Sequence, residues 1–357
     1  MPFQEAKMFL IRKFKSFFIV AISALIFFHC SNYKPTTAGY PYRIFIVADS
    51  LLWLDIKKPV SDVFEGEVLT PVSEKKFYFT WIPLRLLNEF KHRMNIFFIG
   101  VKNEEGEVNE YLRQVLPEEF QKGVQENRYF YLFQDNLFAR GQIGLFMFAR
   151  DRQTFLKDFA DLKDEIYSTF EKKYFARLKE SMFDKGEQFK VEEYIKNNFD
   201  FSIRVQHDYF VAIEEPQVPY LWLRRFDPDR WVSIWKIKGD SSYFNFDSIA
   251  NVRDRFTKKY YEGDYVIRED SKLITADFNG QQTAKMVGLW RNDSVLIGGP
   301  FRTYVIDHPQ DSSLYFVDIA VMAPGHLKKP YLDQLEVIAR TFRIEDRAEK
   351  HQQPDQR

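Results

Sequence analysis

The chain has one cysteine, Cys30, among its 357 residues, so it cannot form an intrachain disulfide. Its fold must therefore be stabilised by a buried core, because no covalent cross-link is available. The composition supplies that core, since 45% of the residues are hydrophobic and 37 are phenylalanine. The length also exceeds the usual domain size of about 100–150 residues. We therefore expect a folded chain of two domains.

The charged residues of the chain balance. Lys and Arg together number 51, Asp and Glu also number 51, and no basic block stands out. Proteins that bind nucleic acid usually carry a basic patch that neutralises phosphate groups. The sequence therefore argues against nucleic acid as a partner.

The segment before Cys30 is typical of an export signal. Three cations come first, namely Arg12, Lys13 and Lys15. A weakly polar to apolar run over residues 16–28 follows them, as in a signal peptide. As a helix this run would reach about 20 Å, which is short of the roughly 30 Å of a bilayer core. We therefore predict a lipoprotein signal peptide over residues 1–29 and lipidation at Cys30.

The residues directly before Cys30 differ from a lipobox, in which small residues usually precede the cysteine. Phe27, Phe28 and His29 stand there instead. An uncleaved anchor and a coincidental cysteine are therefore alternatives to lipidation. The polar, Pro-containing segment 30–41 favours a tether behind a lipidated cysteine. Lipidation would place the protein on a membrane of the cell envelope, facing the periplasm or the cell surface, and would leave the folded part without a thiol.

The first half of the chain alternates predicted strands with predicted helices. The strands are expected at 42–48, 77–82, 95–101, 128–133 and 144–149. Apolar residues recur every three to four positions over 151–183, which predicts a long amphipathic helix. Gly186 follows this helix, so we place the domain boundary at 184–188. The pattern predicts an α/β-type layered domain over residues 42–185.

The second half, residues 186–344, is predicted to be an α+β domain with an antiparallel sheet and flanking helices. Helices are expected at 191–198, 248–261 and 327–342. Strands are expected as a hairpin of 202–205 with 209–213, a pair of 220–225 with 231–238, and three long strands at 283–290, 295–306 and 314–322. A polar tail, 345–357, completes the chain.

Several short motifs carry a resemblance to a known family. They are Gly288-Leu289-Trp290, Ile297-Gly298-Gly299-Pro300-Phe301, and Tyr331-Leu332 to Leu335-Glu336, with shorter segments at 34–35, 39–41, 91–95, 135–142 and 202–203. Together they are similar to an uncharacterised Bacteroidetes lipoprotein family, domain of unknown function 4837, over nearly the whole mature chain. The resemblance implies a lipoprotein, but no activity, cofactor or catalytic residue. The order of elements in the second half also looks like the sandwich of PsbP and Mog1, whose relatives mostly act as binding or assembly modules.

No complete catalytic or cofactor motif is present. The sequence contains neither G-x-S-x-G, a P-loop, G-x-G-x-x-G nor H-E-x-x-H, and no two histidines lie three or four residues apart. We therefore predict no cofactor and no metal site.

Two groups of residues are candidates for a functional site. Asp49, His92 and Arg140 fall near predicted strand ends, where they could line a crevice with Asp49 and His92 as an acid–base pair. Trp222, Trp231 and Trp235 lie on two strands predicted to pair. These tryptophans either pack in the core or form an exposed surface for a partner or glycan.

The leading hypothesis is a non-enzymatic, lipid-anchored envelope protein that binds or helps assemble another envelope protein or a glycan. It rests on the export signal, the large aromatic core and the missing catalytic motifs. The alternative is an envelope hydrolase that uses Asp49, His92 and Arg140.

Overall fold

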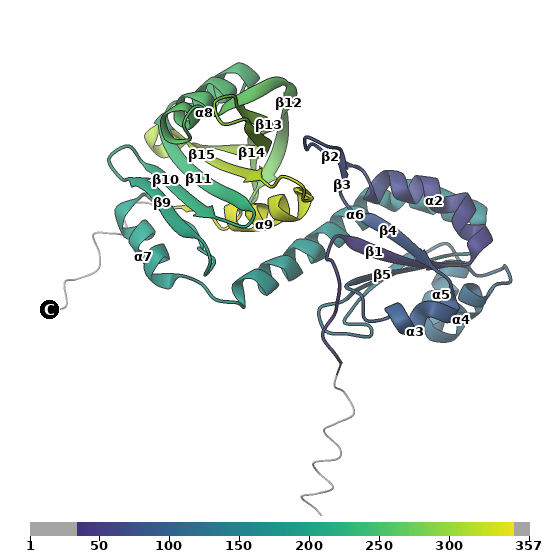
Figure 1. Cartoon of the computed structure of the whole chain (residues 1–357). Coiled ribbons are helices and arrows are strands. Elements are labelled where there is room, and N and C mark those ends of the chain that lie inside the picture. The colour runs from purple at the N-terminus through teal and green to yellow at the C-terminus, as the bar shows by residue number, and fades with distance from the viewer. Residues whose placement is uncertain (1–33, 346–357) are drawn as a thin grey trace, which may run out of the picture.

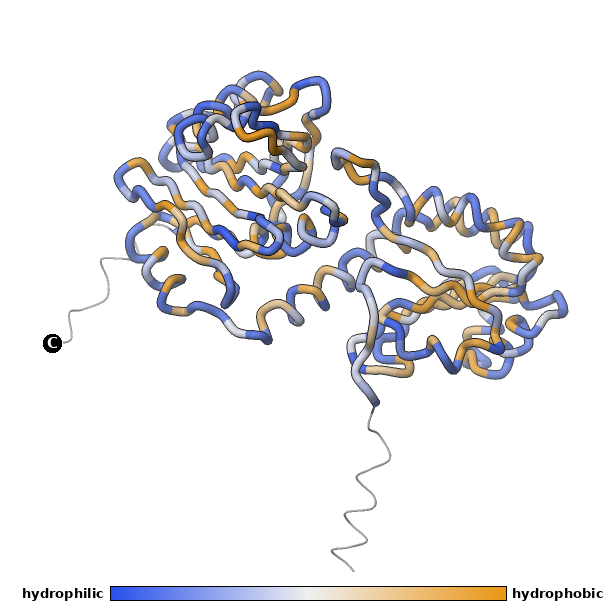
Figure 2. Tube along the Cα trace, in the orientation of Figure 1, coloured by the Kyte–Doolittle hydropathy of each residue, from blue (hydrophilic) through white to orange (hydrophobic). Residues whose placement is uncertain are grey.

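The computed structural model describes residues 34–345, which form two domains joined by a long helix (Figure 1). The predicted signal peptide, with His29 and Cys30, lies outside the described residues, as does nearly all of the predicted polar tail. The predicted α+β class with two domains is confirmed. Hydrophobic residues follow the strands inside both domains (Figure 2).

The N-terminal domain is built on a five-stranded sheet in the order β4-β1-β5-β7-β6. The first four strands in this order pair in parallel, and β6 is antiparallel to β7. Every residue of β5 and β7 is buried, as expected for parallel strands covered on both faces. The strands are β1 (Arg43–Ala48), β4 (Tyr78–Ile82), β5 (Asn95–Val101), β6 (Tyr131–Asp135) and β7 (Ile143–Ala149).

Helices cover both faces of this sheet. On one face, α2 (Ser50–Phe64) and α6 (Arg152–Phe183) pack against the side chains of alternate strand residues. The opposite face is covered by α4 (Glu107–Val115) and α5 (Glu118–Gln125). The short elements η1 (Leu84–Leu86), α3 (Leu87–Phe90), β2 (Glu67–Val68) and β3 (Glu74–Lys75) complete the domain. The result is the layered α/β arrangement that the sequence predicts.

The C-terminal domain contains a seven-stranded antiparallel sheet in the order β12-β13-β14-β15-β11-β10-β9. The helix α8 (Phe246–Tyr260) covers one face of the sheet, and α9 (Lys329–Ala339) covers the other. The strands are β9 (Phe210–Glu215), β10 (Tyr220–Arg225), β11 (Asp229–Lys238), β12 (Tyr265–Phe278), β13 (Gln281–Asn292), β14 (Ile297–His308) and β15 (Ser313–Met322). The remaining elements are α7 (Phe189–Asn198), β8 (Phe201–Ser202), η2 (Ser241–Tyr243), η3 (Pro309–Asp311) and β16 (Arg343–Ile344).

Two expectations for this domain are wrong. The predicted hairpin of 202–205 with 209–213 does not form, because β8 pairs with β16 and β9 pairs with β10. The expected elements also lack β12, a 14-residue edge strand with mostly exposed or half-buried side chains. An edge strand with one uncovered face lacks the hydrophobic run by which buried strands are recognised.

A buried ion pair joins α8 to the sheet beneath it. Arg253 on α8 donates to Asp318 on β15 through Nε at 2.9 Å and Nη2 at 3.2 Å. Both side chains are 0% exposed, and the Thr303 hydroxyl also donates to Asp318. The Arg253 guanidinium lies 3.9 Å from the centre of the Phe301 ring. This pair fixes the position of α8 over the sheet.

The N-terminal segment is held against one edge of the first domain. Thr36 and Ala38 form β-bridges with Arg140 and Arg93. The Pro35 carbonyl accepts from the Arg140 amide at 2.8 Å. Residues 35–38 of the predicted tether 30–41 therefore belong to the folded domain.

Candidate functional site

Asp49 has a structural role in this fold. It lies at the carboxyl end of β1 and is the N-cap residue of α2, but its side chain makes no capping bond within that helix. Its two carboxylate oxygens instead accept from the amides of Val108 and Asn109, both at 3.1 Å. Asp49 therefore caps the start of α4, where free amide groups attract a negative charge.

His92 and Arg140 lie at the N-terminal ends of the strands of the same sheet, opposite the C-terminal end where Asp49 lies. They come shortly before β5 and β7, whereas Asp49 comes directly after β1, and these strands run in parallel. Ala48, next to Asp49, pairs with Ile99 on β5. The first residue of β5, Asn95, lies four residues before Ile99, so the two ends are about 13 Å apart along the strand. The predicted Asp49–His92 pair is therefore wrong. The hydrolase hypothesis loses the convergence on which it depends.

Of the two alternatives for the three tryptophans, the structure shows core packing and not an exposed aromatic surface. Trp222, Trp231 and Trp235 are buried in the cluster beneath α8, as the core-packing alternative predicts. Trp235 lies near the Phe316 ring, with ring centres 5.5 Å apart. Trp222 and Trp231 still line a cavity of the C-terminal domain, which is described below.

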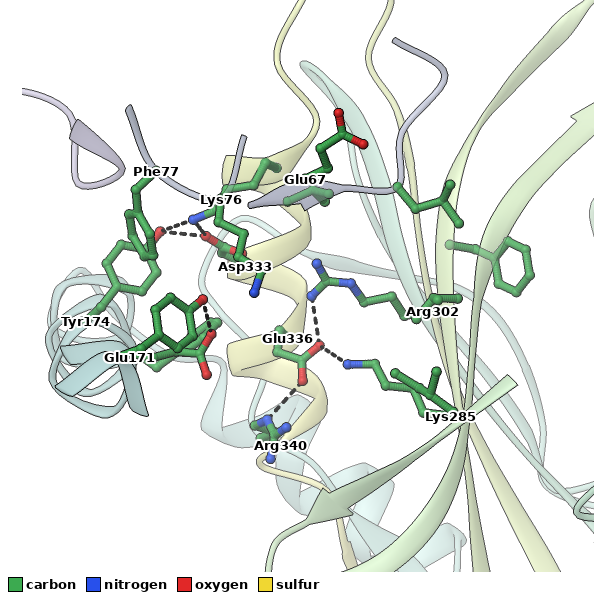
Figure 3. Close-up of a pocket in the computed structure, with 18 of the residues that line it drawn as sticks. Glu67, Lys76, Phe77, Glu171, Tyr174, Lys285, Arg302, Asp333, Glu336 and Arg340 are labelled. Carbon is green, nitrogen blue, oxygen red and sulfur yellow. Dashed lines mark hydrogen bonds and ion pairs between the residues drawn. The ribbon is translucent and has the colours of Figure 1, made fainter. Parts of the chain in front are cut away.

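The main candidate site is a cavity of about 410 Å³ between the two domains. No pattern in the sequence predicts this cavity. Figure 3 shows its polar side chains, which come from α6 and the β2–β3 region on one side and from α9 and the sheet on the other. The charged residues that line it are Glu67, Lys76, Glu171, Lys272, Lys285, Arg302, Lys329, Asp333, Glu336 and Arg340.

Glu336 on α9 is the centre of this cluster. Its carboxylate accepts from Arg340 at 2.9 Å and Arg302 at 3.1 Å, and lies 3.5 Å from the Lys285 ammonium. The Tyr304 hydroxyl donates to it as well. Burial alone would raise the pKa of Glu336, but the three cations outweigh burial and hold this pKa well below its usual range. Glu336 therefore stays ionised at neutral pH.

The cations of this cluster are more accessible than the carboxylate that they surround. The Glu336 side chain is 4% exposed, whereas Lys285, Arg302 and Arg340 are 12%, 17% and 37% exposed. Cationic residues also outnumber acidic ones by six to four in the lining. Burial lowers the pKa of Lys285 to about 8, against the opposing effect of Glu336. The cavity therefore presents positive charge.

A second group of contacts holds the two domains together beside the cavity. The Tyr174 hydroxyl on α6 donates to Asp333 on α9 at 2.6 Å, and Lys329 also donates to Asp333. Burial lowers the pKa of Lys329, and its ammonium lies 4.3 Å from the centre of the Phe77 ring. The orientation of α9 against α6 is thus fixed by buried polar contacts.

Glu74 on β3 adds a further link between the domains. Its carboxylate accepts from the amides of Lys328 and Lys329 at 2.8–2.9 Å. A carboxylate at a helix N-terminus satisfies free amide groups and the helix dipole. The N-terminal domain therefore caps the last helix of the C-terminal domain.

Two features that define other classes of protein are not found in the described part of the chain. Residues 34–345 contain no group of three or more His, Cys, Asp or Glu side chains placed to hold a metal ion. Within the same residues, no helix is long and apolar enough to cross a membrane.

Several solved structures are distantly similar to parts of this chain. A crystal structure of a protein from Bacteroides thetaiotaomicron is 13% identical, with 42% of this chain and 46% of that chain covered and a TM-score of 0.26. The Ran-binding protein Mog1p of Saccharomyces cerevisiae is 13% identical, with 42% and 92% covered and a TM-score of 0.31. LpqN of Mycobacterium tuberculosis, involved in cell envelope biogenesis, is 15% identical, with 41% and 83% covered and a TM-score of 0.26. This chain thus spans less than half the length of the Bacteroides protein.

The sequence comparisons divide the chain as the two domains do. No protein with a curated description matches it. Residues 187–341 match the domain of unknown function DUF4837, as the motifs of the second half predict. Residues 37–183 match a different domain of unknown function, DUF8532, although the similar segments of the first half were attributed to DUF4837. The two matched regions thus correspond to the N-terminal and C-terminal domains of the structure.

Proposed function

We propose that this protein is a lipid-anchored cell-envelope protein that binds an anionic ligand between its two domains without catalysing a reaction. One observation carries the binding part of this proposal. In the interdomain cavity, the buried Glu336 carboxylate is surrounded by cations that keep more exposure than it does. Such a face attracts negative charge, and arginine is well suited to bind oxyanions through paired N–H groups.

The envelope location rests on the sequence. A charged segment and an apolar run end at Cys30, and a polar stretch follows it. Acyl chains on Cys30 would stabilise membrane binding by about 0.8 kcal/mol for each buried methylene group.

Lipidation at Cys30 predicts that the protein incorporates radiolabelled palmitate in cells and sediments with membranes. Cys30→Ala should abolish the label and release the protein into the soluble fraction, because no other cysteine is present. Gel autoradiography and fractionation of both variants measure this. A wild-type protein without label would contradict the anchor, and would leave the binding proposal to be judged separately.

Anion binding predicts that inorganic sulfate binds to the purified protein and that Arg340→Gln weakens this binding about tenfold. Arg340 is the most exposed cation of the Glu336 cluster. A hydrogen bond to a charged group contributes about 1.5–3 kcal/mol, and about 1.4 kcal/mol corresponds to a factor of ten in affinity. Isothermal titration calorimetry at low ionic strength measures the affinity, with chloride as the reference anion.

The matched control for this titration is Arg128→Gln, which removes an exposed arginine outside the cavity and should leave the affinity unchanged. Lys272→Gln, which changes an exposed lysine of the lining, gives a second test if Arg340→Gln does not fold. The affinity should also fall between pH 7 and pH 9, because Lys285 has a pKa of about 8 and loses its positive charge there. Equal affinities for the Arg340 and Arg128 variants would overturn the proposal.

A further inference from the structure

A second cavity, of about 650 Å³, lies entirely within the C-terminal domain. It is lined by residues of β9 and β10, the start of β11 and the C-terminus of α8 with the residues that follow it. The end of β13, the start of β14 and the end of β15 complete the lining. None of its residues lines the interdomain cavity. A volume of this size suits a small ligand, since ligand pockets usually measure about 300–1,000 Å³.

Buried aromatic rings form much of this cavity's lining. Trp222, Trp231, Trp290 and Tyr261 line it, with ring centres 4.6 Å apart for Trp222 and Tyr261 and 5.4 Å apart for Trp231 and Trp290. Among residues 34–345, the buried indole N–H groups of these three tryptophans have no hydrogen-bond partner, and the same holds for Trp235, which does not line the cavity. A buried donor left without an acceptor costs about 1–3 kcal/mol. These N–H groups are closed to solvent, so the cavity offers a ligand the aromatic surfaces rather than these donors.

Planar polar side chains share the cavity with these rings. Arg224 forms a forked pair with Asp229, with Nε 2.8 Å from Oδ1. The Arg224 guanidinium also lies 5.2 Å from the Trp222 ring centre and 4.7 Å from that of Phe226. Stacking and pairing therefore hold this polar group in one orientation.

The acidic residues outnumber the basic ones in this lining. The charged residues of the lining are three acids, Asp229, Glu262 and Asp264, and one cation, Arg224. Asn292 donates to Asp264 at 2.8 Å, and burial raises the pKa of Asp264 to about 6, so this carboxylate is mostly ionised at neutral pH. The excess of negative charge disfavours an anionic ligand.

Some of the apolar side chains that line the cavity are exposed at the protein surface. Phe226 and Val295 are 54% and 53% exposed, and the Phe210 ring lies 5.2 Å from that of Phe226. Contiguous exposed apolar side chains beside a pocket are consistent with a binding site.

We propose that this cavity binds a neutral or amino-sugar glycan. Aromatic faces carry a negative quadrupole, which attracts the C–H groups of a sugar ring. The fixed carboxylates, amide and guanidinium match neighbouring hydroxyl groups. An acyl chain fits less well, because it would desolvate Arg224, Asp229 and Asp264 without offering them hydrogen bonds.

The test is a titration of the full-length protein with four tetrasaccharides, followed by tryptophan fluorescence and calorimetry. The probes are the tetramers of N-acetylglucosamine, glucose and mannose, with tetragalacturonate as the anionic comparison. At least one neutral tetramer should bind and change the tryptophan emission, and tetragalacturonate should not. Trp222→Phe, which removes part of a ring face that lines the cavity, should weaken the binding at least tenfold.

Trp235→Phe is the matched control, because Trp235 is buried in the same aromatic cluster but does not line the cavity. Its affinity should stay within twofold of the wild type. Failure of all three neutral tetramers to bind would overturn the proposal, as would equal losses in the two tryptophan variants. Binding of phosphatidylethanolamine vesicles by a C30A protein that binds no tetramer would assign the cavity to lipid instead. Because the two cavities share no residue, each of these results leaves the sulfate titration unaffected.

Discussion

Replacing Asp318 with asparagine is expected to lower the free energy of unfolding by about 3–5 kcal/mol. Asparagine keeps the size of the side chain but removes the charge that balances Arg253. The guanidinium would remain 0% exposed with no counter-charge in its contact with β15. Domains are usually stable by only about 5–15 kcal/mol, so this single change would remove a large part of the total.

Urea denaturation followed by tryptophan fluorescence measures this loss, because Trp235 and Trp290 lie in the cluster beneath α8. The control is Lys58→Ala, which breaks the exposed pair with Asp62 and should change stability by less than about 0.5 kcal/mol. Replacing both partners, Arg253 by Met and Asp318 by Leu, should recover much of the loss. The expected loss is roughly 3–5 kcal/mol. A free energy of unfolding for D318N within about 1 kcal/mol of the wild-type value would therefore contradict the role given to this pair.

Glu336→Gln is expected to have an effect of similar size, about 3–5 kcal/mol at neutral pH. Lys285, Arg302 and Arg340 would lose the one carboxylate that they share. The pKa of Glu336 is lowered, so its stabilising effect is present above its ordinary value of 4.5 and is lost as the pH falls below that value. The difference between wild type and E336Q should therefore shrink between pH 7 and pH 3.

Urea denaturation at the two pH values measures this difference. Glu118→Gln is the matched control, since Glu118 is an exposed residue that pairs with Lys122 within a helix. That variant should stay within about 0.5 kcal/mol of the wild type. If E336Q behaved like E118Q, the Glu336 cluster would contribute little to the stability of the domain.

Local patterns in the sequence were sufficient to predict most of the elements. The spacing of apolar residues over 151–183 predicts α6 to within one residue, because one face of that helix is buried along its length. Strands covered on both faces, such as β5, are equally clear. Elements without such a pattern could not be predicted. The strand β12 has an uncovered face and therefore no continuous hydrophobic run. The strand β8 is two residues long, and its partner β16 lies far along the chain.

The error over Asp49 and His92 has a simple geometric cause. Both residues lie at strand ends, but one follows its strand and the other precedes its strand. In parallel strands these positions lie at opposite edges of the sheet. The order along the chain already contained this information.

The interdomain cavity could not be predicted in the same way. The pairs Lys329–Asp333 and Glu336–Arg340 have i,i+4 spacing, which is equally typical of exposed helix surfaces. Their importance depends on Arg302 and on the contact of α9 with α6, and both come from distant parts of the chain. Only the tertiary structure separates a buried cluster from a solvated helix face.

The attachment of residues 35–38 to the first domain limits how far the protein could stand from a bilayer. Pro35 lies five positions after Cys30, and a fully extended chain spans at most about 3.6 Å per residue. An acylated Cys30 would therefore keep Pro35 within about 18 Å of the lipid surface. The amino edge of the parallel sheet would then lie next to the headgroups, and the carboxyl edge, where Asp49 lies, would point away from them.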